Sequence, residues 1–192
     1  MMNNLYLLPG YGGRLDTGLG GALLQRGFNV SGRQTIGDFR ALPFDEQVAV
    51  IAADLHHHFW RSDAQVIANS FGCYLFLHAQ AQLPPFVGRV LRLSPILGEF
   101  DHADKAMHFS PPHPTRLSQL AKEGLMPCPL DAQIHVGTED WQSVPDNVLA
   151  FGKAVGIPVH LAEGRGHMLG EDYVGPLLDN WIRNNDPSTD IR

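Results

Sequence analysis

The chain has few cysteines, fewer positive than negative charges and no long apolar run, and each shortage excludes a class of protein. Two cysteines, Cys73 and Cys128, in 192 residues cannot build a disulfide framework, which favours a reducing compartment. Lys and Arg number 14 against 20 Asp and Glu, and the formal charge of −6 argues against a surface for nucleic acid or anionic membrane. No segment reaches the ~18 apolar residues of a membrane span, and the opening residues lack a signal-peptide pattern. We therefore expect a cytoplasmic globular protein that binds neither nucleic acid nor membrane; the sequence identifies no protein partner.

Strand-like apolar runs alternate with helical patterns along most of the chain. Apolar residues repeat with the helical period over residues 45–60 and 174–182, and residues 71–82 are apolar almost all round, as expected of a central, buried helix. This alternation predicts an α/β protein with a mostly parallel sheet of about six strands and helices on both faces. Residues 1–183 form the single predicted domain, and the polar segment 184–192 is expected to be a flexible tail. The predicted strands cover residues 4–8, 28–31, 64–69, 87–94, 131–137 and 157–161.

One serine lies in a pattern that is typical of a nucleophile elbow. Ser70 follows the apolar run Val66-Ile67 and has Ala68 and Gly72 at its second neighbours. Small residues at these two positions allow a strained strand-to-helix turn that exposes the serine hydroxyl. The pattern alone is weak, but no other serine of the chain combines it with a preceding strand. Ser70 is therefore the candidate nucleophile, and its alternative role is a small residue that closes a strand.

Two further residues of a hydrolytic triad follow predicted strands in a consistent order. Asp140 comes after the strand over 131–137, and His167 comes after the last strand in a glycine-rich turn. The order Ser…Asp…His is that of α/β hydrolases and differs from the trypsin and subtilisin orders. His167 is the candidate base, and Asp140 is the candidate acid that orients the imidazole, with Glu139 and Asp131 as rivals.

The glycine-rich turn Pro9-Gly10-Tyr11-Gly12-Gly13 follows the first predicted strand. Backbone N–H groups of Tyr11 and of Phe71, the residue after the nucleophile, are expected to form an oxyanion hole. The side chain of Tyr11 could also form a wall of the acyl pocket. A phosphate-binding loop is the alternative, but neither the dinucleotide fingerprint nor a Walker lysine is present.

The run His56-His57-His58 invites interpretation as a metal site. Consecutive residues on a helix point about 100° apart, so these rings cannot converge on one ion. A position near the C-terminus of a helix, where positive charge is favourable, explains them better. We expect no metal and no cofactor, and we expect both cysteines to be inert thiols.

Taken together, these residues resemble the α/β-hydrolase superfamily almost from end to end. The resemblance is strongest to small serine hydrolases similar to retinoblastoma-binding protein 9 and to short bacterial esterases. It includes the opening strand and its glycine turn, the elbow at Ser70, Gly137-Thr138-Glu139-Asp140 before Val144-Pro145, and Gly166-His167. The chain differs from the usual pattern by Ala68 and Cys73 in place of glycines and by Asn69 in place of a histidine.

Residues 98–127 interrupt the alternation with several prolines and only one short helical pattern, over 115–123. Such an insertion after a strand commonly forms a cap over the site. Four of its apolar residues could line a pocket for a short acyl chain, or could simply pack the cap onto the sheet. These four residues are Phe100, Met107, Phe109 and Leu117.

The sequence thus predicts a serine hydrolase that cleaves an ester or related acyl bond of a small substrate through an acyl-enzyme. Esterase, amidase and thioesterase activities share this machinery and stay open. The alternative is a hydrolase-fold protein that mainly binds a partner protein, with little or no activity. An intact triad disfavours that alternative, since a binding protein gains nothing from a strained elbow beside a base.

Overall fold

The computed structural model describes residues 4–102 and 106–183, so the tail predicted over 184–192 lies outside the described residues. Its centre is a six-stranded parallel sheet in the order β2-β1-β3-β4-β7-β8. All six predicted strands are present within two residues of their predicted bounds, and the predicted fold class is confirmed. The strands are β1 (Asn4–Leu8), β2 (Asn29–Gly32), β3 (Gln65–Asn69), β4 (Arg89–Leu93), β7 (Asp131–Gly137) and β8 (Val159–Ala162).

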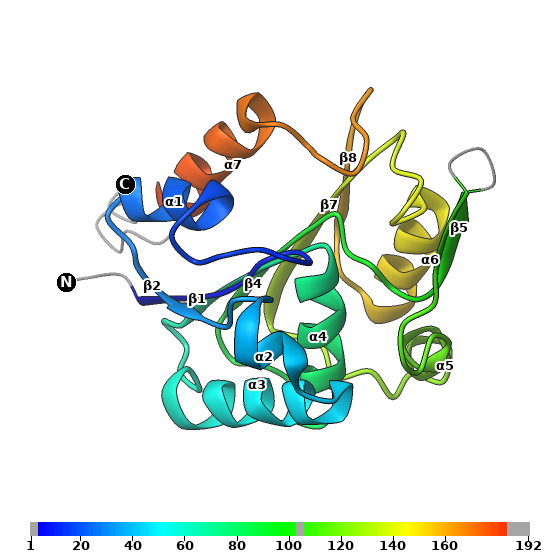
Figure 1. The fold of residues 1–192 in the computed structure, drawn as a ribbon, viewed down its shortest axis with the longest axis horizontal. Coiled ribbons are helices and arrows are strands. Elements are labelled where there is room, and N and C mark those ends of the chain that lie inside the picture. The colour runs from blue at the N-terminus through cyan, green and yellow to red at the C-terminus, as the bar shows by residue number, and fades with distance from the viewer. Residues whose placement is uncertain (1–3, 103–105, 184–192) are drawn as a thin grey trace.

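Helices cover both faces of this sheet (Figure 1). One face carries α1 (Gly18–Gln25) and α7 (Glu171–Arg183), while the other carries α3 (Phe44–His58), α4 (Phe71–Gln80) and α6 (Pro145–Val155). The helices predicted over 45–60, 71–82 and 174–182 correspond to α3, α4 and α7. In the described part of the chain, no helix combines the length and the apolar character that crossing a membrane requires.

Alternation of side chains along the strands places buried apolar residues on both faces of the sheet. In β1, Leu5 and Leu7 pack with Leu23 of α1, whereas Tyr6 and Leu8 pack on the α3 and α4 side. Successive side chains of a strand point to opposite faces, so a strand buried on both faces must be apolar throughout. This is why β1 and β3 read as unbroken apolar runs.

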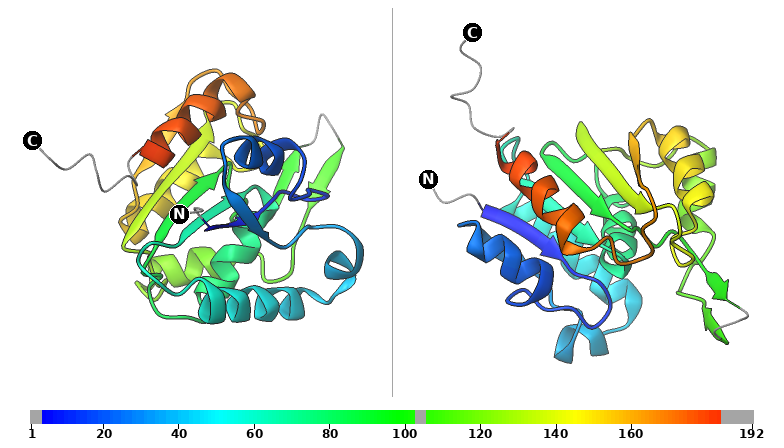
Figure 2. Two further views of the ribbon diagram at one scale, coloured as in Figure 1. Left: turned by 90° about the vertical axis from the view of Figure 1, so that its left-hand side faces the viewer. Right: turned by 90° about the horizontal axis from the view of Figure 1, so that it is seen from above.

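The segment predicted to be a cap contains three short elements. The strands β5 (Phe100–His102) and β6 (Met107–Phe109) pair antiparallel, and α5 (Arg116–Lys122) is the helix predicted over 115–123. The hairpin was not predicted, because strands of three residues are too short to show alternation. Figure 2 shows this hairpin standing apart from the main sheet, while α5 buries Leu117 and Ala121 in a core that it shares with α6.

The topology brings the candidate site residues to one edge of the sheet. The chain passes from β1 outward to β2 and then returns to β3 on the other side of β1. The carboxyl ends of parallel strands at such a reversal form the usual binding crevice of an open α/β sheet. The loops after β1, β3, β7 and β8 all leave from this edge, and they carry Tyr11, Ser70, Asp140 and His167 respectively.

Candidate active site

Ser70 occupies a strained turn between β3 and α4. Its φ of 53° and ψ of −120° lie in a region that residues with a side chain rarely adopt. The backbone is fixed on both sides: the N–H of Ser70 donates to Leu93 O at 2.9 Å, and its carbonyl accepts from the N–H of Cys73 at 3.0 Å. The turn therefore has the geometry of a nucleophile elbow, with the serine at the start of the helix.

Close backbone packing explains the small residues around the elbow. A Cβ added to Gly72 would lie 2.1 Å from Leu8 O and 2.6 Å from Pro9 O, so no larger residue fits there. Ala68, which replaces the more usual glycine, is fully buried, and its methyl group is accommodated in the core. Cys73 is also fully buried and donates weakly to Leu93 O; burial raises the pKa of its thiol to about 12. This thiol stays protonated, in line with the predicted inert role.

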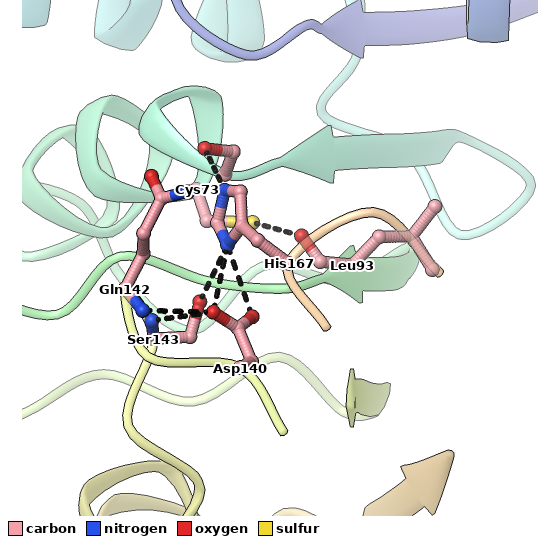
Figure 3. Close-up of polar contacts among 7 residues, drawn as sticks. Cys73, Leu93, Asp140, Gln142, Ser143 and His167 are labelled. Atoms are coloured by element: carbon pink, nitrogen blue, oxygen red, sulfur yellow. Dashed lines mark hydrogen bonds and ion pairs between the residues drawn. The ribbon is translucent and has the colours of Figure 1, made fainter. Parts of the chain in front are cut away.

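The imidazole of His167 connects Ser70 with Asp140. Its Nε2 lies 2.8 Å from Ser70 Oγ, and its Nδ1 lies 3.0 Å from each carboxylate oxygen of Asp140. Figure 3 shows the ring of His167 directly facing the carboxylate of Asp140. The structure thus brings all three predicted triad residues together in one hydrogen-bonded chain, although they lie on three different loops. The rival Glu139 is exposed, and its backbone N–H binds Arg165 O instead.

Asp140 is a buried carboxylate that accepts hydrogen bonds from the backbone of the turn that follows it. Only 1% of the residue is exposed, and its Oδ1 accepts the backbone N–H groups of Gln142 at 2.9 Å and Ser143 at 3.0 Å. Burial would raise the pKa of Asp140, but the hydrogen bonds from His167, Ser143 and Gln142 outweigh it and lower the pKa below 3.8. The group is therefore a carboxylate at neutral pH and can stabilise a positive charge on His167.

Ser143 is a residue of this site that the sequence reasoning missed. Besides its N–H bond to Asp140, its Oγ lies 3.4 Å from His167 Nδ1, and the residue is buried. The signal was present in the sequence, since an Asp whose carboxylate binds the N–H groups two and three residues later is a common turn. Ser143 therefore contributes to the orientation of both Asp140 and His167.

The glycine turn after β1 lies against the nucleophile. A Cβ on Gly10 would lie 3.3 Å from Ser70 Cβ, and the Gly13 N–H donates to Gly10 O at 2.9 Å across a tight turn. Gly12 has a φ of 75°, as the third residue of a type II turn requires. Within the described part of the chain, the N–H groups of Tyr11 and Phe71 have no hydrogen-bond partner. Both predicted oxyanion-hole donors are thus available at the turn and at the first residue of α4.

The four residues predicted to line a substrate pocket do not line either of the cavities described below. Two cavities among the described residues, of about 470 Å³ and 200 Å³, have other lining residues. Leu117 is fully buried in the core and Phe100 stacks on Phe109 with ring centroids 5.0 Å apart, while Met107 is exposed. Only Phe109 reaches the site, with its ring 6.0 Å from that of Phe71. The alternative, that these residues pack the segment together, fits their surroundings better.

The larger cavity lies between the segment 97–99, α5 and α6. Its lining includes Gln142 and Ser143 of the Asp140 turn, together with Val144, which has a φ of 48°. A β-branched residue at positive φ is strained, so the loop after Asp140 is held in an unusual conformation beside this cavity.

The histidine run His56-His57-His58 lies in the last turn of α3, as predicted. The rings of His56 and His57 are 5.2 Å apart and cross at 79°, so they do not converge. Among residues 4–102 and 106–183, no three His, Cys, Asp or Glu side chains come together in a way that could hold a metal ion.

Known proteins match this chain in fold but not in sequence. No protein-family model matches the chain, and no curated protein matches it in sequence. Solved structures do match over nearly the whole length. An α/β-hydrolase enzyme from a sediment metagenome of the Mar Chica lagoon, Morocco, has 15% sequence identity and a TM-score of 0.66, with 97% of this chain and 93% of that chain covered.

Two further matches carry more specific names. A carboxylesterase from the thaumarchaeon Nitrososphaera gargenis has 13% identity and a TM-score of 0.65, covering 98% of this chain and 92% of that chain. A monoacylglycerol lipase from Paleococcus ferrophilus has 14% identity and a TM-score of 0.65, covering 95% of each chain. The chain therefore has the α/β-hydrolase fold, as the resemblance of its sequence motifs implied.

Proposed function

We propose that this protein is a serine hydrolase that cleaves an ester or related acyl bond through an acyl-enzyme on Ser70. The observation that carries the proposal is the 2.8 Å contact between Ser70 Oγ, on a strained elbow, and His167 Nε2. Strain at a non-glycine residue persists only where the surrounding structure enforces it, and such residues cluster at active sites. The names of the structural matches, among them a carboxylesterase and a lipase, support the same class of reaction.

In the first half of the reaction, Ser70 Oγ attacks the carbonyl carbon of the substrate while His167 Nε2 takes the hydroxyl proton. The carbonyl π electrons move to the oxygen, and the N–H groups of Tyr11 and Phe71 stabilise that oxyanion. Asp140 stabilises the imidazolium through Nδ1. Collapse of the tetrahedral intermediate then expels the alcohol, which leaves with the proton that His167 returns to it.

In the second half, water replaces the alcohol. His167 removes a proton from a water molecule as its oxygen attacks the acyl carbon, and the second tetrahedral intermediate collapses to release the acid. The proton returns from His167 to Ser70 Oγ, which restores the starting state. Every proton in this cycle moves through one nitrogen, Nε2, because Nδ1 stays bound to Asp140.

A panel of p-nitrophenyl esters from acetyl to dodecanoyl tests the proposal, with the Ser70→Ala variant measured beside the natural chain. We expect turnover that favours acyl groups up to about hexanoyl, since the cavity lined by Tyr11 and Phe71 holds only about 200 Å³ and the segment over residues 98–127 holds only one short helix in its described part. Ser70→Ala should lose at least ~10³-fold in kcat. Turnover that survives this substitution would contradict the proposal. No turnover of any ester or thioester would favour the binding-protein alternative.

A further inference from the structure

A second cavity, of about 200 Å³, lies beside the proposed oxyanion hole. Tyr11 and Phe71, whose N–H groups are the proposed oxyanion donors, also form part of its wall. Their rings meet edge to face with centroids 5.7 Å apart. Phe71 follows Ser70 directly in the chain, so one wall of the cavity is formed by the neighbour of the proposed nucleophile. Its remaining lining residues are Thr35, Arg40, Phe44, Gln47 and Pro112.

Two polar side chains of this cavity, those of Thr35 and Gln47, are hydrogen-bonded to the backbone. The hydroxyl of Thr35 donates to Gly10 O and accepts the Gly13 N–H, so it holds the glycine turn. The amide nitrogen of Gln47 donates to Leu42 O at 2.8 Å. Arg40 is the one charged residue in the lining, and it forms no ion pair with any residue that the structure describes.

The Arg40 guanidinium is nevertheless held in place by an aromatic ring. Its central carbon lies 4.2 Å from the centroid of the Tyr11 ring, and one of its N–H groups donates to the Tyr11 hydroxyl. Arginine stacked on an aromatic face keeps its remaining N–H groups in a planar fork that matches a carboxylate. The cation is therefore exposed but ordered at the wall of a cavity that the rings of Tyr11, Phe44 and Phe71 also line, and its remaining N–H groups can donate to an anion.

We propose that this cavity binds an acyl group that ends in a carboxylate, with Arg40 as the residue that recognises the charge. The inference rests on the proposed serine hydrolase function and assigns its substrate class: monoesters of short dicarboxylic acids. The volume agrees with this class. At about 30 Å³ per atom-sized water molecule, 200 Å³ accommodates roughly six non-hydrogen atoms, the number in a glutaryl chain beyond its ester carbonyl.

Two p-nitrophenyl esters of the same shape test the proposal: the half ester of glutaric acid and the ester of 5-methylhexanoic acid. The branched end of the second has the shape of a carboxylate without its charge. After subtraction of spontaneous hydrolysis, we expect kcat/KM of the natural chain to be at least about tenfold higher for the glutarate. A tenfold preference corresponds to the contribution of about one hydrogen bond to a charged group. The preference should shrink as salt is raised, because Arg40 is exposed.

Variants of Arg40 assign the preference to its charge. Arg40→Gln should remove the preference for the glutarate, Arg40→Glu should reverse it, and Arg40→Lys should keep part of it because the charge stays and the fork is lost. Arg61→Ala is the matched control, since Arg61 is an exposed arginine that pairs with Asp63 outside the cavity. It should keep the natural ratio.

The outcomes separate this inference from the proposed function. Ser70-dependent turnover with equal kcat/KM for both esters would overturn the substrate class and leave the hydrolase intact. A third ester, p-carboxyphenyl butanoate, carries the anion on the leaving group. If Arg40 variants affect only that ester, the assignment of the cavity to the acyl side is wrong. A lack of turnover of all three esters, together with no fluorophosphonate labelling of Ser70, would overturn both proposals.

Discussion

Both carboxylate oxygens of Asp140 lie 3.0 Å from Nδ1 of His167, so the imidazole faces the carboxylate symmetrically. Asp140 is buried and ionised, and its Oδ1 is also held by two backbone N–H groups. The acid therefore cannot rotate away, and the imidazole that it orients presents Nε2 to Ser70. These hydrogen bonds hold the three side chains in one arrangement, and the predictions below follow from it.

Loss of the base should abolish turnover. His167→Ala removes the group that accepts the Ser70 proton, and the remaining residues cannot replace it, because a triad acts as a unit. We expect kcat to fall at least ~10³-fold, measured on p-nitrophenyl acetate. The control is His57→Ala, which removes an exposed histidine from α3 and should leave kcat near that of the natural chain. Equal losses in the two variants would argue against His167 as the base.

The acid can be distinguished from its neighbour by paired amide substitutions. Asp140→Asn keeps the shape of the side chain but cannot stabilise the imidazolium, and we expect a loss of about 10³–10⁴-fold in kcat. Glu139→Gln should stay near the natural value, since Glu139 is exposed. If Glu139→Gln lowers kcat more than Asp140→Asn does, then Glu139 and not Asp140 is the acid of the triad.

The elbow should not tolerate a methyl group at Gly72. Because the added Cβ would lie 2.1 Å from Leu8 O, the backbone must shift, and we expect Gly72→Ala to lower the free energy of unfolding by about 1–3 kcal/mol. The control is Gly166→Ala, whose added Cβ would have its nearest neighbour 3.9 Å away. Chemical denaturation of both variants measures the difference. Similar stabilities would mean that the strand and helix are less closely packed around Ser70.

Low pH should destabilise the folded protein through two buried histidines. Burial lowers the pKa of His78 and of His135 from 6.5 to about 4, with a further contribution from nearby His113 and His160 respectively. Between about pH 6.5 and 4 the unfolded chain binds these two protons and the folded chain does not. Stability is therefore fully present above pH ~6.5 and falls as the pH drops, by up to ~1.4 kcal/mol per pH unit for each histidine.

Substitution of His135 tests this linkage. His135→Asn retains a polar group that can bond to the Tyr173 hydroxyl, which lies 2.8 Å from Nδ1, but does not titrate. The slope of unfolding free energy against pH should decrease by up to ~1.4 kcal/mol per pH unit in this window, while His57→Asn should leave it unchanged. An unchanged slope in His135→Asn would show that folding does not lower the pKa of His135.

The sequence predicts the sheet well, and it identifies three candidate residues that the structure brings together, because both depend on local signals. A strand buried on both faces is mostly apolar, so β1 and β3 are visible as short apolar runs, and Ser70 follows one of them. Asp140 and His167 follow β7 and β8, which contain polar residues and are less distinct. The order of the strands brings Ser70, Asp140 and His167 together without any further information. The helices α1, α2 (Gly37–Ala41) and α6 and the hairpin of β5 and β6 were not predicted. For α2 and the hairpin the reason is length, because elements of three to five residues carry too little periodicity.

The lining of the cavities could not be read from the sequence. Phe100 and Leu117 were grouped with a pocket because they are apolar and lie in the inserted segment, yet apolar residues fill cores as readily as pockets. The residues that do form the small cavity, such as Arg40 and Phe44, lie in a stretch with no motif. They meet Tyr11 only because α2 and the start of α3 fold next to the glycine turn. Such contacts between distant segments depend on tertiary packing.

Labelling by a fluorophosphonate tests the central claim most directly, because the probe reacts with a serine only where a base activates it. The natural chain should gain one phosphonyl group, detected by intact-protein mass spectrometry, and peptide mapping should place it on Ser70. Ser70→Ala should gain none, and His167→Ala should react far more slowly. Labelling at another serine, or equal labelling of the Ser70→Ala variant, would contradict the account.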